Sequence, residues 1–119
     1  MTSRADRRLD LVVYGATSFV GQILCRHLVE RHGTDGPLTW AIAGRDAAKL
    51  DAVAAATGAE VERIVADAGD RRALDDMVGM TRVVVSTVGP YAKYGSELVA
   101  AVVAAGTDYC DLTGETQWM

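Results

Sequence analysis

The sequence predicts an α/β fold in which helices cover both faces of a doubly wound parallel sheet of five strands. Short apolar runs alternate with segments of helical spacing, and the connections between them are short. The apolar runs are continuous, which is typical of parallel strands that are buried on both faces. Strand–helix alternation of this kind is typical of βαβ crossovers. We therefore expect the strand order 3-2-1-4-5.

The first strand and helix lie near the N-terminus. Leu9–Tyr14 is an apolar run that ends at a glycine, which predicts a buried strand. Apolar residues recur along one side of Phe19–His32, which predicts a helix that Gly33 ends. We expect residues 1–8 to form a tail and residues 9–119 to form one domain.

The same alternation continues along the chain. Further strands are predicted at 38–43, 61–66, 82–88 and 107–112, and further helices at 46–57, 70–80 and 95–106. Asp46 and Asp70 are expected to begin their helices as capping residues. The valine-rich fourth strand predicts a central place in the sheet. The arginine pairs at 7–8 and 71–72 are expected at solvated ends of elements.

Composition and charge fit one small globular domain. The chain has 119 residues, of which 50% are hydrophobic and 24% charged. A net charge of -4 argues against a nucleic-acid surface, which needs a basic patch. The two cysteines and two histidines lack metal-binding spacing, so we expect no metal site, no disulfide and a cytoplasmic location. We find no apolar stretch of signal-peptide or membrane-spanning length.

The turn between the first strand and helix carries the strongest functional signal. It follows a strand and precedes a helix, which is the context that a dinucleotide-binding glycine motif requires. Gly15 permits the tight turn, Ser18 stands where a second close-approach glycine is often found, and Gly21 lets the helix pack on the strand. The residues expected to hold a pyrophosphate are Gly15, Ala16, Thr17, Ser18, Phe19, Val20 and Gly21. The alternative is an ordinary βα turn.

Arg45, after the second predicted strand, favours NADP(H) over NAD(H) as the cofactor. NAD-binding domains usually carry an acidic residue there to accept hydrogen bonds from the ribose 2′-hydroxyl. A guanidinium instead suits a 2′-phosphate, and we expect the small residues Ala43 and Gly44 to leave room for it. The alternative is that Arg45 pairs with Asp46 or points to solvent.

Residues after the later strands are candidates for the rest of the cofactor. Asp67 and the backbone of Ala68 are expected at the adenine, although Asp67 could instead cap the next helix. The turn whose backbone is expected to line the nicotinamide ribose, or else to be a plain turn, consists of Thr87, Val88, Gly89, Pro90 and Tyr91. Asp111 or Glu115 could face a substrate or solvent. The sequence identifies no catalytic residue.

Four motifs together resemble the saccharopine dehydrogenase-like oxidoreductases. In order, they are Gly15–Gly21, Ala43–Arg45, Thr87–Tyr91 and Tyr109–Glu115. Within that group the chain is similar to trans-acting enoyl reductases that work with polyketide synthases on long-chain lipid intermediates. The resemblance implies a Rossmann-type NADP(H)-binding domain that reduces an activated double bond or an imine. It also implies a polyketide synthase as partner and leaves a membrane-surface association of a longer parent open.

In the family a second domain that holds the substrate lies beyond residue 119. We therefore expect the chain to be a fragment or truncated product that lacks turnover alone and exposes an apolar patch near Trp118. One alternative is a sensor that binds NADP(H) without turnover, and another is a non-catalytic remnant without cofactor affinity. Short-chain dehydrogenases are competing relatives, but their Tyr-x-x-x-Lys pair does not occur in these residues.

Overall fold

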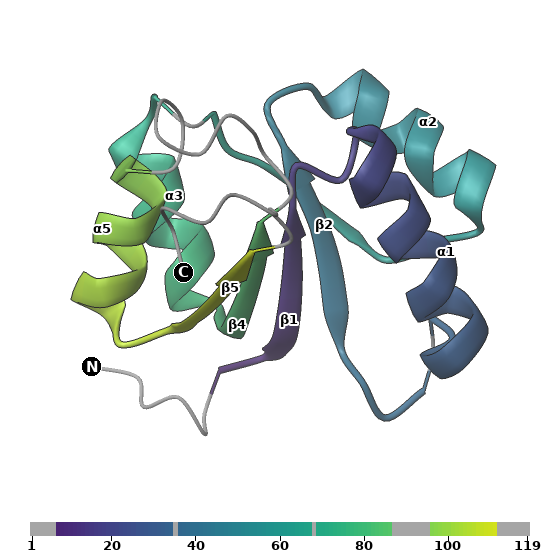
Figure 1. Ribbon diagram of the computed structural model, residues 1–119, viewed down its shortest axis with the longest axis horizontal. Coiled ribbons are helices and arrows are strands. Elements are labelled where there is room, and N and C mark those ends of the chain that lie inside the picture. The colour runs from purple at the N-terminus through teal and green to yellow at the C-terminus, as the bar shows by residue number, and fades with distance from the viewer. Residues whose placement is uncertain (1–6, 35, 68, 87–95, 112–119) are drawn as a thin grey trace.

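The computed structural model describes residues 7–34, 36–67, 69–86 and 96–111. In these residues five strands alternate with four helices (Figure 1). In chain order the elements are β1 (Leu9–Tyr14), α1 (Phe19–His32), β2 (Trp40–Gly44), α2 (Ala47–Thr57), β3 (Glu62–Val65), α3 (Arg71–Gly79), β4 (Thr81–Ser86), α5 (Ser96–Ala105) and β5 (Asp108–Asp111). Each predicted strand and helix is present, with bounds that differ by a few residues at the ends.

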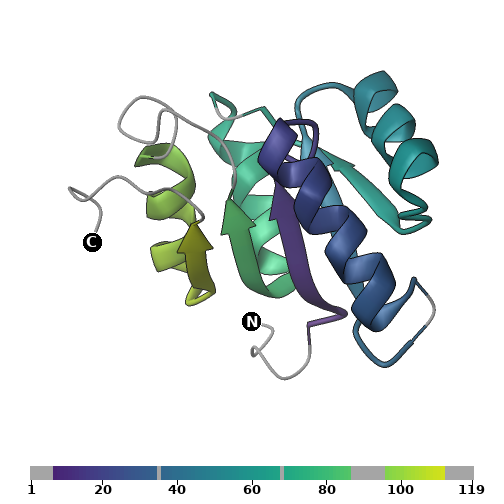
Figure 2. The ribbon, with the colours of Figure 1, turned by 45° about the vertical axis from the view of Figure 1, so that its right-hand side comes forward.

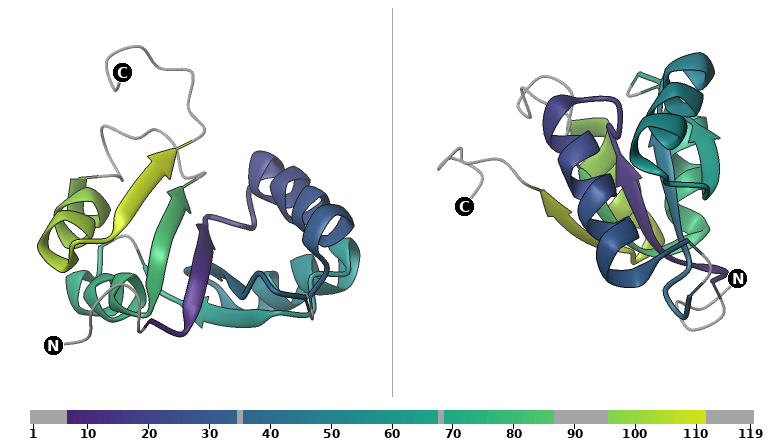
Figure 3. Two further views of the ribbon diagram at one scale, coloured as in Figure 1. Left: turned by 90° about the horizontal axis from the view of Figure 1, so that it is seen from below. Right: turned by 90° about the vertical axis from the view of Figure 1, so that its right-hand side faces the viewer.

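All neighbouring strands are parallel, and their order is β3-β2-β1-β4-β5, as the sequence predicts. β1 is the central strand, because Val13 pairs with Ile42 of β2 on one side and with Val85 of β4 on the other. β3 is an edge strand and is mostly exposed, which explains why Glu62 and Arg63 are tolerated in it. Figure 3 shows the strands side by side with a helix pair on each side.

The helices form two layers, and each layer encloses its own hydrophobic core (Figure 2). α1 and α2 pack on one face of the sheet, where Cys25, Leu28 and Leu50 meet Val13 and Ile42. The residues of α3 and α5 that pack on the other face are Leu74, Met77, Val78, Leu98, Ala101 and Val102. Burial of apolar surface on both faces is the main stabilisation of such a sheet. None of the helices in the described ranges is both long and apolar enough to cross a membrane.

Two aspartates begin helices as the sequence predicts. The Asp46 side chain accepts a hydrogen bond from the backbone N–H of Lys49 at 3.1 Å, and Asp70 accepts one from Ala73 at 3.2 Å. A cap of this kind contributes about 1 kcal/mol because it satisfies a backbone donor that the helix leaves unpaired. These caps fix where α2 and α3 leave the loops that follow β2 and β3.

The expectation of solvated arginine pairs is wrong for Arg7. Its guanidinium is partly buried and donates to the carbonyl oxygens of Thr81 at 2.9 Å and Ala105 at 2.6 Å, as well as to the Thr107 hydroxyl. It also reaches the Val78 carbonyl near the end of α3 at 3.4 Å. A cation is favourable at helix C-termini because the last carbonyls carry partial negative charge. Arg7 therefore fastens the chain before β1 to the ends of α3 and α5.

Candidate nucleotide-binding site

The carboxyl ends of β1, β2 and β3 meet at one edge of the sheet, which is the upper edge in Figure 1. Backbone hydrogen bonds fasten these ends together. Gly15 and Ala16 both donate to the Ala43 carbonyl, at 2.9 and 3.2 Å, and Ala66 donates to the Gly44 carbonyl at 2.8 Å. The loops that follow the three strands are thus held next to one another. Ligands of doubly wound sheets bind at this edge.

The two glycines of the first turn are required by its geometry. Gly15 has a φ of 83°, a left-handed conformation that a side chain would strain. A Cβ on Gly21 would lie 2.5 Å from the Gly15 carbonyl oxygen and 2.8 Å from the Ala16 Cα. Only glycine therefore lets the start of α1 pack this closely on the end of β1, which is the role that the sequence predicts for Gly21.

The N-terminal end of α1 presents backbone donors. Ser18 is the N-cap residue, and its hydroxyl oxygen accepts from the Gly21 N–H at 3.0 Å. Among the described residues, the N–H groups of Thr17, Phe19 and Val20 have no acceptor. The first turn of α1 contains no acidic side chain. These donors and the positive end of the helix dipole suit an anion such as a pyrophosphate.

Arg45 lies exposed directly after β2, and within the described residues it has no ion pair. The pairing with Asp46 that the sequence left open is absent, because Asp46 accepts from Lys49 instead. The expectation that Ala43 and Gly44 leave room for a phosphate stays a prediction. Both are buried, and Ala43 packs in the core on the α3 and α5 side of the sheet.

Asp67 lies exposed, two residues after the end of β3. Its carboxylate accepts a hydrogen bond from the Gly69 N–H at 2.9 Å, so it closes a local turn. The alternative role as the cap of the next helix is wrong, because Asp70 holds that position. Asp67 and Arg45 both influence the hydroxyl of Tyr14. Burial and, to a smaller extent, the negative charge of Asp67 raise the pKa of Tyr14 to about 12, and the positive charge of Arg45 opposes this rise.

Several predicted site residues lie outside the described residues. These are Ala68, Thr87, Val88, Gly89, Pro90, Tyr91, Glu115 and Trp118. The strands that precede two of these segments are described, and Ser86 at the end of β4 pairs with Asp111 at the end of β5. Both of these strand ends therefore lie at the same edge of the sheet as the 15–21 turn.

A cavity of about 370 Å³ lies at the opposite edge of the sheet. It is lined by residues that precede or begin strands, among them Arg8, Thr39 and Glu62. The 15–21 turn does not line it, and neither does Arg45 or Asp67. It is therefore separate from the candidate site. In the part of the chain that the structure describes, no group of histidine, cysteine, aspartate and glutamate residues could hold a metal ion.

Sequence reasoning missed Tyr14. This residue ends β1 directly before Gly15, and its buried hydroxyl donates to the Ala66 carbonyl at 2.8 Å. In the sequence Tyr14 is the last residue of an apolar run, and nothing local distinguishes it from a core residue. Its partner is the backbone carbonyl of the residue that follows β3, which no residue pattern reveals.

Comparison with known proteins assigns the chain to a family. A trans-acting enoyl reductase of Mycobacterium tuberculosis is 44% identical over 116 residues, which are 95% of this chain and 27% of that protein. The chain therefore spans about a quarter of the length of that relative. Apo saccharopine dehydrogenase (L-Glu forming) from Saccharomyces cerevisiae matches 91% of this chain with a TM-score of 0.73 and 24% identity, over 22% of its own length.

An NADPH complex of a quinone oxidoreductase from Escherichia coli has the same fold, with a TM-score of 0.65 and 22% identity over 82% of this chain and 34% of its own. At such identities the likeness shows the fold alone. The family model described as the saccharopine dehydrogenase NADP binding domain matches residues 11–118. The chain therefore belongs to the saccharopine dehydrogenase NADP-binding domain family.

Proposed function

We propose that this chain binds NADP(H) at the carboxyl edge of its sheet and serves as the cofactor domain of an enoyl reductase. Two observations on the described residues together carry the proposal. Backbone N–H groups at the start of α1 have no acceptor there, and Arg45 on the neighbouring loop has no ion-pair partner there. The first feature suits a pyrophosphate and the second suits a 2′-phosphate. NADP(H) carries both groups.

Each loop that the sequence predicts at the site has a role in this proposal. The N–H groups of Thr17, Phe19 and Val20 hold the pyrophosphate, and the guanidinium of Arg45 pairs with the 2′-phosphate. Asp67 lies at the adenine, together with the backbone of Ala68. Residues 87–91 line the nicotinamide ribose. The contacts proposed for the 15–21 turn, Arg45 and Asp67 require no change of the sheet, because β1, β2 and β3 already end at one edge.

The proposed reaction is the reduction of an activated carbon–carbon double bond in a lipid or polyketide intermediate. When bound, NADPH supplies the hydride, and the chemistry of this transfer belongs to the cofactor. The residues described above contribute binding and orientation. Because the chain spans 27% of the relative named as a trans-acting enoyl reductase, we assign substrate binding and proton transfer to segments beyond this chain.

The proposed partner of the longer protein is a polyketide synthase that presents the enoyl intermediate. The proposed compartment is the cytoplasm, since neither Cys25 nor Cys110 forms a disulfide. The relative is named a trans-acting enoyl reductase, which supports a separate protein as partner, and the absence of a disulfide between the two cysteines suits a reducing compartment.

Calorimetric titration with NADPH and with NADH tests the cofactor site. We expect the chain to prefer NADPH, and Arg45→Ala to weaken NADPH binding by about tenfold or more. A charge-assisted hydrogen bond contributes about 1.5–3 kcal/mol, and 1.4 kcal/mol corresponds to a factor of ten. Arg45→Ala should leave NADH binding nearly unchanged, because NADH lacks the 2′-phosphate.

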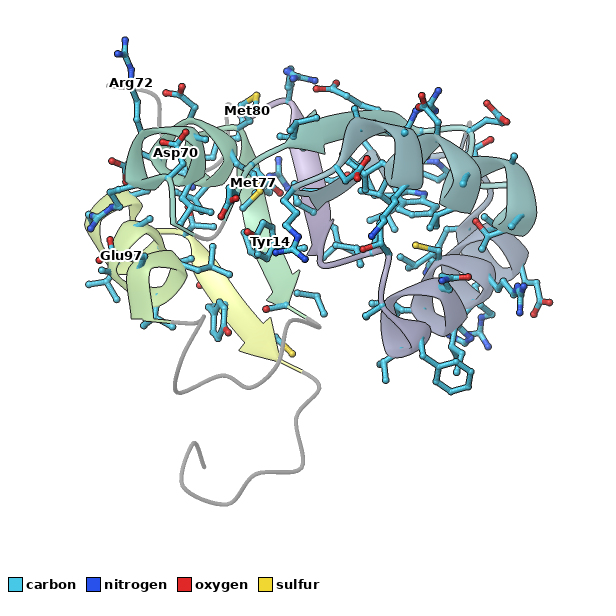
Figure 4. The ribbon with its side chains drawn as sticks, turned by 90° about the horizontal axis from the view of Figure 1, so that it is seen from above. Tyr14, Asp70, Arg72, Met77, Met80 and Glu97 are labelled. Carbon is cyan, nitrogen blue, oxygen red and sulfur yellow. The ribbon has the colours of Figure 1, made fainter. Side chains whose placement is uncertain are left out.

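Arg72→Ala is the matched control, since Arg72 is an exposed arginine on the outer side of α3, away from Tyr14 (Figure 4). This variant should bind NADPH like the unaltered chain. Equal losses in the two variants would mean that only net charge matters, and no binding by the folded chain would refute the proposed site. In the longer protein, NADPH binding without oxidation in the presence of enoyl substrates would favour a sensor instead of an enzyme.

A further inference from the structure

Tyr14 occupies an unusual place for a buried tyrosine. It ends the central strand β1, directly before the 15–21 turn, and its side chain is 2% exposed. The ring lies in the core on the α3 and α5 side of the sheet, on the same side as Met77 (Figure 4). Its hydroxyl donates to the carbonyl of Ala66, directly after β3, at 2.8 Å. The contact therefore spans from the central strand to the edge strand.

β2 lies between the two strands that this contact joins. Neighbouring strands are about 4.8 Å apart, so the phenol must reach across the whole width of β2. Ala43 of β2 is the register partner of Tyr14 and belongs to the same core cluster. A methyl group at this position leaves space for the Tyr14 ring, which a larger side chain would fill. The small size of Ala43 thus allows the Tyr14 ring to cross β2.

The hydrogen bond from Tyr14 completes the attachment of Ala66. The Ala66 N–H donates to the Gly44 carbonyl at 2.8 Å, and its carbonyl accepts from Tyr14, so both of its backbone polar groups are fixed. Gly44 directly precedes Arg45, and Ala66 directly precedes Asp67. The buried hydroxyl of Tyr14 therefore helps to fix the backbone from which both loops begin. These are the loops that would hold the adenosine half of the cofactor.

We infer that Tyr14 is a positioning residue for the adenosine end of the dinucleotide site, which acts by fixing the ends of β2 and β3 beneath Arg45 and Asp67. This inference rests on the proposed function. Tyr14 does not need to touch the cofactor for this role. The charges of Arg45 and Asp67 both act on its hydroxyl.

The test compares Tyr14→Phe with Thr57→Val, using adenosine 2′,5′-bisphosphate as the calorimetric probe. Each substitution removes one buried hydroxyl that donates to a backbone carbonyl, because Thr57 donates to Val53 at 2.7 Å. Thr57 lies at the end of α2 that is remote from Arg45. Circular dichroism and urea unfolding record the fold and stability of both variants.

We expect Tyr14→Phe to weaken probe binding by about fivefold, the effect of losing one hydrogen bond of ordinary strength. Thr57→Val should lose similar stability without losing affinity. In the Arg45→Ala background, Tyr14→Phe should weaken binding less than it does alone, because the two residues act on the same contact.

Unaltered probe affinity in folded Tyr14→Phe, or an equal loss in both hydroxyl variants, would overturn the inference and leave the proposed function standing. Failure of the unaltered chain to bind the probe and NADPH would overturn both. If the losses of binding free energy in Tyr14→Phe and Arg45→Ala were fully additive, this would also count against the inference. Additivity would mean that Tyr14 and Arg45 act on binding independently.

Discussion

Replacing Gly21 with alanine should destabilise the chain by forcing α1 away from β1. The new methyl group would lie 2.5 Å from the Gly15 carbonyl oxygen and 2.8 Å from the Ala16 Cα, and both are backbone atoms that cannot rotate away. Inserting a methyl group into a packed site costs about 1–3 kcal/mol. Alanine regains about 0.5–1 kcal/mol in a helix relative to glycine, so we expect a net loss of about 1–2 kcal/mol.

Gly79→Ala is the matched control, because Gly79 also lies in a helix and a Cβ there would meet no atom within 4 Å. This variant should gain up to about 1 kcal/mol from the reduced freedom of the unfolded chain. The difference between the two alanine variants isolates the cost of the close contact. Urea unfolding followed by circular dichroism measures this difference in the free energy of unfolding. In thermal unfolding, the midpoint temperature should shift by about 4 °C per kcal/mol for a domain of this size.

The reasoning fails if Gly21→Ala is as stable as Gly79→Ala. In that case α1 could move without cost, and the close approach of helix and strand would not constrain the turn. A second readout is nucleotide binding, because a displaced α1 carries its backbone donors away from the pyrophosphate. Gly21→Ala should therefore weaken NADPH binding, and Gly79→Ala should not.

Three further predictions concern the termini of the elements and the two thiols. Arg7→Met should lower the free energy of unfolding by about 2–3 kcal/mol in urea titrations, since a charged donor to several partly buried acceptors is lost, and Arg7→Lys should restore part of it. The hydrogen bond from Arg8 holds the pKa of Glu62 below its ordinary value of 4.5. Their ion pair therefore stabilises the fold above pH 4.5, and this stabilisation is lost as the pH falls through the lowered pKa of Glu62. Because Glu62 is partly exposed and screened, Glu62→Gln should cost under about 1 kcal/mol at pH 7, and a cost that persists at pH 2 would contradict this reasoning. Burial raises the pKa of Cys25 to about 11, so iodoacetamide at pH 8 should modify the exposed Cys110 first, and mass spectrometry should find Cys25 modified only after unfolding.

The fold could be predicted because its signals are local. An apolar run followed by a glycine predicts β1, and Asp46 and Asp70 predict the starts of the helices that they cap. The ends of the strands differ from the predicted bounds by a few residues, because pairing with a neighbouring strand sets where a strand ends and the sequence does not show that neighbour. Glu62 begins β3 because it pairs with Ala41 of β2.

The site could be predicted only in part. Gly21 and Arg45 follow from spacing after a strand, and the structure gives a steric reason for the first and an exposed position for the second. Arg7 and Tyr14 were missed because both donate to backbone carbonyls that are distant in the sequence. The small size of Ala43 is visible in the sequence, whereas the ring of Tyr14 that packs in the same core cluster is not.

The central position of β1 has a consequence for how the chain folds. Leu11 of β1 pairs with Trp40 on one side and with Val83 on the other, so its second set of partners is far along the chain. Contacts between residues distant in sequence cost chain entropy before they contribute any stability, and they slow folding. During synthesis, β1 is made before the other four described strands, yet it keeps one open edge until β4 has emerged. Until then the sheet offers unpaired backbone groups along its central strand, and we expect the chain to be most prone to aggregation during this interval.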